Sequence, residues 1–580
     1  MGIKHFWHWY KSNFGEYIKN LRKHQDFKTI NVSIDNLMID LNGVFHNSTQ
    51  KVYQYGNCKP QRRLLGQDKR KKMGGIQQQK KVFADVCSTI ESLFSLVEPN
   101  KRLILCIDGP APLSKQNQQR QRRFRSAMEK DDEEFTRFDG NSITPGTKFM
   151  DYLSKYIDWY IKKRITESAK WQQVEIIFSN EKSPGEGEHK IINYIRKYGN
   201  AEDSFCIHGL DADLIMLALG THLPNFWILR EDMYDYKNEF FVLDIGQTRK
   251  KLSSIMSWVK EENKEGEIKF NPEYSVNDFI FICFMVGNDF LPHIPSIEII
   301  EGGIDFILDV YKNVGERYGH LTSNKDGDIV FQKKPLEVFM GTISQYNKGI
   351  LEDKLMKKDK FFPDILLENS AKIVEGKYVL DIDKYKKDYY KKCFADGIDI
   401  KKLCHEYLEG MQWVLSYYTR GVPDWKWCFK NHYAPFAHEL AEYIGDFKFP
   451  DKRETEPSKP FQQLLSVLPP KSYRLIPIPI CQLLTNKSSP IKKFCPDKFE
   501  VDISGKRREW EGIVLLPMVD FDVIEKEYTK HIDKVDKRDL VRNKLGKSFI
   551  YKYDNSNQFL FRSYYGNIDN CCVAIEMIDI

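Results

Sequence analysis

Seven acidic residues at five places in the first half of this 580-residue chain each follow a short apolar run. They are Asp40, Asp108, Glu186, Glu188, Asp211, Asp213 and Asp289. Carboxylates brought together in this number repel one another unless cations neutralise them. Hard divalent ions with oxygen ligands, Mg²⁺ or Mn²⁺, meet that need. Two such ions about 3.5–4 Å apart can activate a water and stabilise the leaving oxygen of a phosphodiester.

A second chemical signal is a cationic helix that starts just after Asp108. The segment Gly-Pro-Ala-Pro at 109–112 ends the preceding apolar run, and helix formers follow it. The spacing i, i+4, i+7 and i+8 places four polar side chains on one face: Lys115, Gln119, Arg122 and Arg123. Such a face can bind a phosphate. Taken alone, a charge run is more often a solvated helix face.

The elements that must position these groups alternate between strands and helices. Short apolar runs at 37–39, 103–107, 174–180 and 279–287 read as buried strands, and helical patterns lie between them. This order predicts βαβ units and an α/β fold with a mostly parallel central sheet flanked by helices. Ligand sites of such sheets lie at the carboxyl ends of the strands, so we expect the seven acids to face one crevice. A single Asp after a strand is more often a helix N-cap, but five such places in order are harder to explain that way.

Composition narrows the class of protein. The formal net charge is +6, so a surface for nucleic acid must come from local clustering of cations. The 12 cysteines include no C-x-x-C pair, which favours a reducing compartment over a zinc ribbon or a disulfide framework. No secretory segment or membrane span is recognisable. These features predict a soluble intracellular protein without a membrane partner, and they leave cytoplasm and nucleus both open.

The rest of the chain gives weaker signals. We expect an exposed loop over 47–80, where the KRKK at 69–72 is either a nuclear address or part of a solvated surface. From about 401 the chain is dense in Trp and Tyr among cations, which suits base stacking, although most such aromatics belong to cores. Residues beyond 530 are charged and then β-prone.

The ordered motifs resemble those of a known family, the XRN 5′→3′ exoribonucleases, which are related to the flap-endonuclease/PIN nucleases. They are IDLNGVFH, CIDGPAPLSKQNQQRQRRFR, PGEGEHKI, GLDADLIML, GNDFLPHIP and EGMQWVLSYYTRGVPDWKWCFKNHYAPF. The resemblance covers most of 1–525. It implies a catalytic region at 1–325, a variable Lys/Tyr-rich connector at 326–400, a largely helical, aromatic-rich second region at 401–525, and a C-terminal tail at 526–580.

The resemblance also implies roles for individual residues. The seven acids would form a two-metal site, and the four residues of the cationic helix face would grip a 5′-monophosphate. His46 resembles a family histidine that stacks on a substrate base, and Trp427 resembles its partner. The implied activity is processive hydrolysis of single-stranded, 5′-monophosphorylated RNA to mononucleotides, by a monomer that can work with decapping or RNA-processing partners.

Some features depart from the family pattern. The long C-terminal domains of large cytoplasmic members and a CCHC zinc knuckle are both missing from this sequence, and 59–81 reads as an insertion. Two other functions remain open: a structure-specific DNA flap endonuclease, which shares the acidic site, and a catalytically inactive RNA-binding scaffold. The scaffold should have lost metal-binding acids, and none of the motif acids is missing here.

Overall fold

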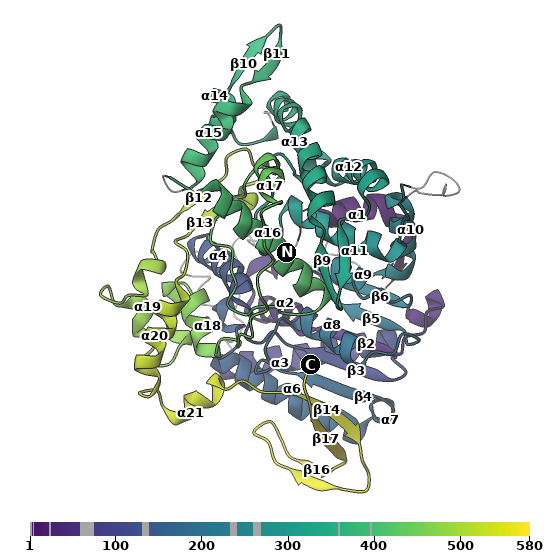
Figure 1. The fold of residues 1–580 in the computed structure, drawn as a ribbon. Helices are drawn as coiled ribbons and strands as arrows, with labels where there is room; N and C mark the ends of the chain where they lie inside the picture. Colours follow the sequence, from purple (N-terminus) through teal and green to yellow (C-terminus); the bar gives the residue numbers. More distant parts are fainter. Residues whose placement is uncertain are drawn as a thin grey trace, which may run out of the picture.

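The central feature of the computed structural model is one nine-stranded sheet with helices on both faces (Figure 1). The structure describes residues 3, 5–22, 25–58, 75–129, 138–231, 240–258, 268–357, 360–394 and 397–580. In spatial order the strands are β1 (Ile18–Leu21), β7 (Phe240–Asp244), β6 (Phe226–Glu231), β5 (Phe205–His208), β2 (Asn36–Asp40), β3 (Arg102–Cys106), β4 (Glu175–Ser179), β14 (Ser548–Tyr553) and β17 (Val573–Ile578). The five strands from β6 to β4 are mutually parallel. The predicted α/β class with a mostly parallel sheet is confirmed.

Strand residues alternate between two hydrophobic cores because successive side chains point to opposite faces of a sheet. In β2, Leu37 and Ile39 lie in one core and Met38 in the other. The first core contains helices α2 (Leu41–Tyr53), α3 (Gly75–Val97) and α6 (Lys148–Glu167). The second contains α1 (Phe6–Phe14), α8 (Gly187–Tyr198), α9 (Asp213–Leu219), α10 (Ile245–Met256), α11 (Pro272–Cys283) and α12 (Gly303–Tyr318).

The second half of the chain packs onto the same body. Helix α16 (Ile400–Thr419) contributes Tyr407, Trp413 and Tyr417 to the core that holds α8 to α12. Helix α4 (Leu113–Glu129) instead joins a third core through Phe124, with α18 (Pro460–Val467), α19 (Gln482–Thr485) and α20 (Phe521–Ile532). The regions at 1–325 and 401–525 therefore share buried side chains.

The predicted connector at 326–400 is largely ordered. It contains β9 (Asp328–Phe331), α13 (Lys333–Met356), α14 (Ile365–Asn369), the hairpin β10 (Ala371–Val374) and β11 (Lys377–Leu380), and α15 (Ile382–Cys393). The hairpin projects from the body at the top of Figure 1. Although α13 has 24 residues, neither it nor any other helix of the described residues is apolar enough to cross a membrane.

Two predicted elements are wrong. The apolar run at 279–287 is not a strand: it forms the end of α11 and a 3-10 turn, because its apolar residues are buried on all sides of a helix in a large core. A buried helix cannot be told from a buried strand by an apolar run alone. The loop expected over 47–80 is partly helical, since α2 continues to Tyr53 and α3 begins at Gly75. The KRKK segment lies outside the described residues.

The segment at 526–580 adds two strands to the central sheet. Strand β14 pairs antiparallel with β4, and β17 pairs with β14. Ser548 Oγ donates a hydrogen bond to Ser179 Oγ at 2.8 Å, and the Gly546 N–H donates to the Lys182 carbonyl at 2.9 Å. The last strands thus bind the loop that leads from β4 toward Glu186.

Candidate active site

Two loops that carry predicted site residues are joined by backbone hydrogen bonds. The Gly109 N–H donates to the Gly185 carbonyl at 2.8 Å, and the Gly185 N–H donates to the Pro110 carbonyl at 2.9 Å. A Cβ at Gly109 would lie 1.7 Å from the Ser183 carbonyl oxygen, so no larger residue fits there. This close approach brings Asp108, at the end of β3, next to the start of α8.

Asp40 and Asp108 both contact the first turn of α8. The Gly187 N–H donates to Asp108 Oδ1 at 2.7 Å. A Cβ on Gly187 would lie only 2.5 Å from Asp40 Oδ1, which shows how tightly that carboxylate packs against the helix. Asp40 also caps α2 by accepting the Asn42 N–H at 3.3 Å, as the N-cap alternative expected. Capping one helix and facing another are therefore compatible roles for Asp40.

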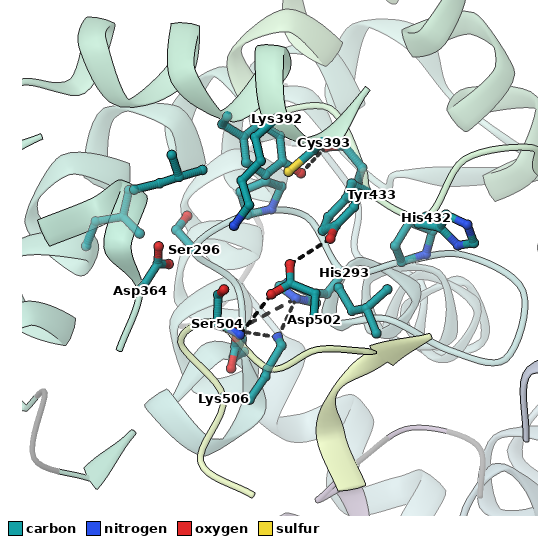
Figure 2. Close-up of a pocket in the computed structure, with 18 of the residues that line it drawn as sticks. His293, Ser296, Asp364, Lys392, Cys393, His432, Tyr433, Asp502, Ser504 and Lys506 are labelled. Carbon is teal, nitrogen blue, oxygen red and sulfur yellow. Dashed lines mark hydrogen bonds and ion pairs between the residues drawn. The ribbon is translucent and has the colours of Figure 1, made fainter. Parts of the chain in front are cut away.

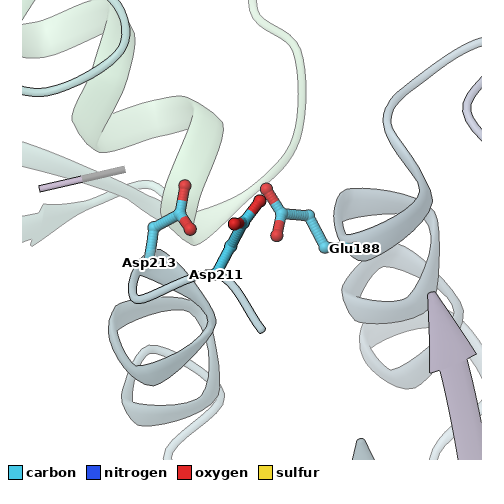
Figure 3. A group of neighbouring side chains, drawn as sticks. All are labelled: Glu188, Asp211 and Asp213. Carbon is cyan, nitrogen blue, oxygen red and sulfur yellow. The ribbon is translucent and has the colours of Figure 1, made fainter. Parts of the chain in front are cut away.

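A second group of carboxylates comes from α8 and α9. Figure 3 shows Glu188, Asp211 and Asp213 turned toward one another, and each offers an oxygen within 4.8 Å of the others. Glu188 and Asp213 are buried, whereas Asp211 is exposed. Among the described residues, Glu188 Oε2 and Asp213 Oδ1 are buried oxygens without a hydrogen-bond partner. Buried polar atoms normally have a partner, so this place is suited to a cation.

Lys115 lies between two further acids of the predicted set. Its Nζ is 2.5 Å from Glu186 Oε2 and 2.8 Å from Asp289 Oδ2. Burial alone would lower the pKa of Lys115, but the carboxylates of Asp289 and Glu186 hold that pKa well above its usual value. Asp289 therefore reaches the site from the turn after α11, although no strand precedes it. All seven predicted acids contact or electrostatically influence another member of the set.

The electrostatics of this centre favour added positive charge. Burial, followed by the charges of neighbouring acids, raises the pKa of Asp40 and of Glu188 well above the usual values. Burial and the charge of Asp211 raise the pKa of Asp213 to about 7. Carboxylates are acceptor-only, hard oxygen ligands of the kind that Mg²⁺ and Mn²⁺ bind. The donor set and the unpartnered oxygens both fit divalent cations.

The predicted phosphate-binding residues of α4 differ in their exposure to solvent. Arg122 is exposed, whereas Gln119 and Arg123 are buried. Arg123 Nη1 donates to Thr144 Oγ1 at 2.6 Å, and burial together with the charge of Arg122 lowers the pKa of Arg123 to about 9. Gln119 Oε1 accepts a hydrogen bond from Gln463 Nε2 at 3.3 Å. The role of these residues stays a prediction.

The two predicted base-stacking residues also differ in exposure. His46 is half-buried on α2, six residues after Asp40. The ring of Trp427 is 9% exposed and stacks on Trp413, with centroids 5.0 Å apart. Trp425 is half-buried, and its carbonyl accepts the Leu113 N–H at 2.9 Å, which joins this loop to the first residue of α4. Base stacking by either predicted residue stays a prediction.

Three residues of the site lie within the quoted motifs, but the sequence alone assigned them no role. Tyr417, on α16, donates its hydroxyl hydrogen to Glu186 Oε1 at 2.7 Å. The His189 ring stacks on Tyr417 at a centroid distance of 3.6 Å. Lys190 Nζ donates to the carbonyls of Asn180 and Ser183 at 2.9 and 3.1 Å, which fixes the loop before Glu186. A tyrosine in an aromatic-rich helix predicts a core residue, and only the fold brings this one to a carboxylate.

A separate cavity of about 90 Å³ lies where residues 292–298 meet α13, α15 and the segment at 502–506 (Figure 2). Lys506 Nζ is 3.1 Å from Glu298 Oε1, and Lys354 Nζ is 3.3 Å from the same oxygen. On another side of the cavity the Tyr433 hydroxyl donates to Asp502 at 2.6 Å. The two ion pairs of Glu298 connect the 1–325 region to the later part of the chain.

The fold and the site together define an α/β protein with a carboxylate-rich centre at the carboxyl ends of parallel strands. The family model for the XRN 5′-3′ exonuclease N-terminus matches residues 1–232, and the model for the Xrn1 helical domain matches 269–377 and 368–578. This chain belongs to the XRN 5′-3′ exonuclease family.

Named relatives are similar over most of this chain. The 5′-3′ exoribonuclease 1 of Saccharomyces cerevisiae is 30% identical over 94% of this chain and 45% of its own length. The 5′-3′ exoribonuclease 2 homolog of Drosophila melanogaster is 30% identical over 91% of this chain and 69% of its own. The chain thus spans about half the length of the yeast relative. The catalytic core of Rad2 in complex with DNA substrate has a TM-score of 0.33 at 14% identity, covering 77% of this chain and 99% of that one.

Proposed function

We propose that this protein is a 5′→3′ exoribonuclease that hydrolyses 5′-monophosphorylated, single-stranded RNA to mononucleotides. The observation that carries the proposal is the cluster of mostly buried carboxylates beside the basic helix α4, in a chain of the XRN family. The named relatives are 5′-3′ exoribonucleases, which favours RNA over a DNA flap as the substrate. The presence of all seven motif acids disfavours an inactive scaffold.

In this proposal the acids bind two divalent cations, Mg²⁺ or Mn²⁺. Asp40, Asp108, Glu186, Glu188, Asp211, Asp213 and Asp289 would hold them. Bound there, the ions would supply Lewis acidity and a lowered pKa for the attacking water. Tyr417 orients one oxygen of Glu186 through its hydrogen bond, and Gly187 fixes Asp108. Lys115 neutralises part of the negative charge and so limits repulsion of the RNA backbone.

The 5′ end would be held by α4. Lys115, Gln119, Arg122 and Arg123 form the proposed pocket for the 5′-monophosphate, with His46 and Trp427 against the first bases. Arg122 is the exposed guanidinium of this set and can meet an incoming phosphate directly. Arg123, bonded to Thr144, would shape the wall behind it. A closed pocket of this kind accounts for removal of one nucleotide at a time and for rejection of capped ends.

The proposal extends to the organisation of the chain. We take 1–325 as the catalytic region, 326–400 as a connector, 401–525 as the region that completes the pocket, and 526–580 as a tail whose strands brace β4. We propose a monomer that works in the cytoplasm or the nucleus with decapping or RNA-processing factors.

A time course on RNAs of one sequence tests the function. The RNAs carry a 5′-monophosphate, a 5′-triphosphate or a cap, and each is incubated with Mg²⁺ or with EDTA. We expect mononucleotides from the 5′-monophosphate RNA with Mg²⁺ only. A DNA flap in the same series addresses the flap-endonuclease alternative, and preferential cleavage inside that flap would contradict the proposal.

The charge reversal Arg122→Glu tests the pocket separately. It should slow hydrolysis of 5′-phosphate ends more than that of 5′-hydroxyl ends, because only the former place a dianion beside the substituted residue. Equal losses on the two ends would mean that α4 is a general phosphate track.

A further inference from the structure

We propose that Arg120, a buried residue of α4, determines by its charge how strongly this protein prefers a 5′-phosphate end. Arg120 is not one of the four residues assigned to the 5′-phosphate pocket. Three residues of an α-helix turn by about 300°, so its side chain leaves α4 about 60° from that of Arg123. The inference rests on the function proposed above and adds a residue that acts on the substrate from a distance.

Arg120 is a buried cation without a counter-charge. The residue is 1% exposed, and its guanidinium group lies 5.0 Å from the centroid of the Phe124 ring. Its Nη2 donates to the Phe494 carbonyl, whereas Nε and Nη1 have no hydrogen-bond partner among the described residues. No carboxylate in the described part of the chain forms an ion pair with it. Burial lowers the pKa of Arg120 to about 10, so the group is still charged at neutral pH.

Packing alone does not explain an arginine at this position. Its neighbours include Phe124, Phe494 and Cys495, which all belong to the third core. Arginine is rarely buried without a partner, and replacing buried charged groups by apolar residues of similar volume is often neutral or stabilising. Residues that depart from the rules of packing in this way are expected at functional sites. The buried guanidinium group therefore indicates a use for its charge.

Two other cations of α4 are neutralised, unlike Arg120. Lys115 pairs with two acids of the centre, and Arg125 Nε lies 2.6 Å from Glu129 Oε1. The charge of Arg120 is not cancelled in this way, so it adds to the positive potential around Arg123, its neighbour one turn further along the helix. A terminal phosphate carries about 1.5 to 2 negative charges at pH 7, and an internal phosphodiester carries one. The potential therefore favours the 5′-phosphate end over the rest of the RNA.

Equilibrium binding in EDTA tests the inference without reading hydrolysis. Fluorescence anisotropy compares two RNAs of one sequence, with a 5′-phosphate or a 5′-hydroxyl end, and the ratio of their Kd values measures the preference. We expect Arg120→Met to lower this preference about tenfold, the order expected for one unit charge that acts on a dianion from roughly 10 Å through screening salt.

Two further variants separate the charge from the hydrogen bond. Arg120→Gln keeps a donor for the Phe494 carbonyl but carries no charge, so it should lose as much of the preference as Arg120→Met. Arg120→Lys keeps the charge and should retain most of the preference. Arg125→Met is the matched control, because it removes from the same helix a guanidinium group whose charge Glu129 already neutralises. It should leave the preference unchanged.

A purely structural role for Arg120 predicts a different pattern. Equal weakening of both RNAs by Arg120→Gln, or an unchanged preference, would overturn the inference. A folded Arg120→Lys protein that has lost the preference would do the same, and circular dichroism shows which variants are folded. A wild-type protein that passes the time course above but binds both ends equally would overturn this inference alone. A protein that fails the time course and still gives the expected binding pattern would contradict only the proposed function.

Discussion

Replacing Gly187 by alanine should shift one carboxylate of the centre without removing any. The new Cβ would lie 2.5 Å from Asp40 Oδ1 and 3.2 Å from its Cγ, whereas ordinary contacts begin at 3.4 Å. The Asp40 carboxylate and the start of α8 must therefore separate by about 0.9 Å. The backbone itself accepts alanine, because Gly187 is not among the glycines with a left-handed φ. The strain falls on the site and not on the turn.

A displacement of this size is large for catalysis and small for stability. A misplacement near 1 Å can cost about 100-fold in rate, so we expect kcat/KM for 5′-monophosphorylated RNA to fall by about that factor. The helix should stay formed, because alanine is the better helix former by about 1 kcal/mol. The thermal midpoint should therefore change by only a few degrees.

The assay is a kcat/KM measurement over a series of Mg²⁺ concentrations, with circular dichroism on the same samples. Gly349→Ala is the matched control, since Gly349 lies in α13 with nothing within 4 Å of its Cβ position. It should leave kcat/KM unchanged. Gly187→Ala with wild-type kcat/KM at every Mg²⁺ concentration would refute the assignment of Asp40 to the centre.

Three further variants test other contacts. Tyr417→Phe removes the donor to Glu186, which should raise the pKa of that carboxyl, shift the acidic limb of the pH–rate profile upward and lower kcat/KM about tenfold. Asp211→Ala should abolish Mg²⁺-dependent hydrolysis, measured as the mononucleotides formed. It should leave RNA binding largely intact, measured by fluorescence anisotropy. Glu298→Gln leaves Lys506 without its carboxylate and should lower the free energy of unfolding by about 3 kcal/mol in urea titrations at neutral pH. Burial alone would raise the pKa of Glu298, but Lys506 and its neighbours hold that pKa below its usual value, so the stability it provides is present above about pH 4.3 and lost as the pH falls further.

Each of these three predictions has a result that would contradict it. Tyr433→Phe removes a similar hydroxyl–carboxylate bond at Asp502 and serves as the control for Tyr417→Phe, so equal kinetic effects would deny Tyr417 a role in the site. Residual hydrolysis at the wild-type rate would remove Asp211 from the centre. A Glu298→Gln protein as stable as the wild type at both pH 7 and pH 4 would show that the buried pair contributes nothing.

The sequence predicted the parallel strands and the acids at their ends because both depend on local pattern. Apolar runs closed by Asp or Gly-Pro mark strand ends, and parallel topology then gathers those ends at one edge. The pattern failed at 279–287, where an apolar run is equally compatible with a buried helix. Asp289 still reaches the centre, because the turn after α11 and the ion pair with Lys115 bring it there.

Other features depend on contacts between distant segments and have no local signal. The spacing on α4 predicted one face for its polar residues, but the packing of α18 against that helix buries Gln119 and leaves Arg122 exposed. The contact between Tyr417 and a site carboxylate requires α16 to dock on α8. The pairing of β14 with β4 could not be expected either, since a β-prone tail does not indicate which strand it will join.

That last pairing also has a consequence for how the protein forms. The hydrogen bond between Ser179 and Ser548 joins residues that are 369 positions apart in the sequence. Strand β4 therefore has no neighbouring strand on one side until β14 has left the ribosome. Contacts of such long range form slowly, and an unpaired strand edge is prone to pair with other chains. A nascent chain would therefore carry an exposed β4 edge, within reach of chaperones, while those intervening residues are made. The loop toward Glu186 gains its last supporting hydrogen bonds only when β14 arrives, so the acidic centre is not complete until residue 548 has been made.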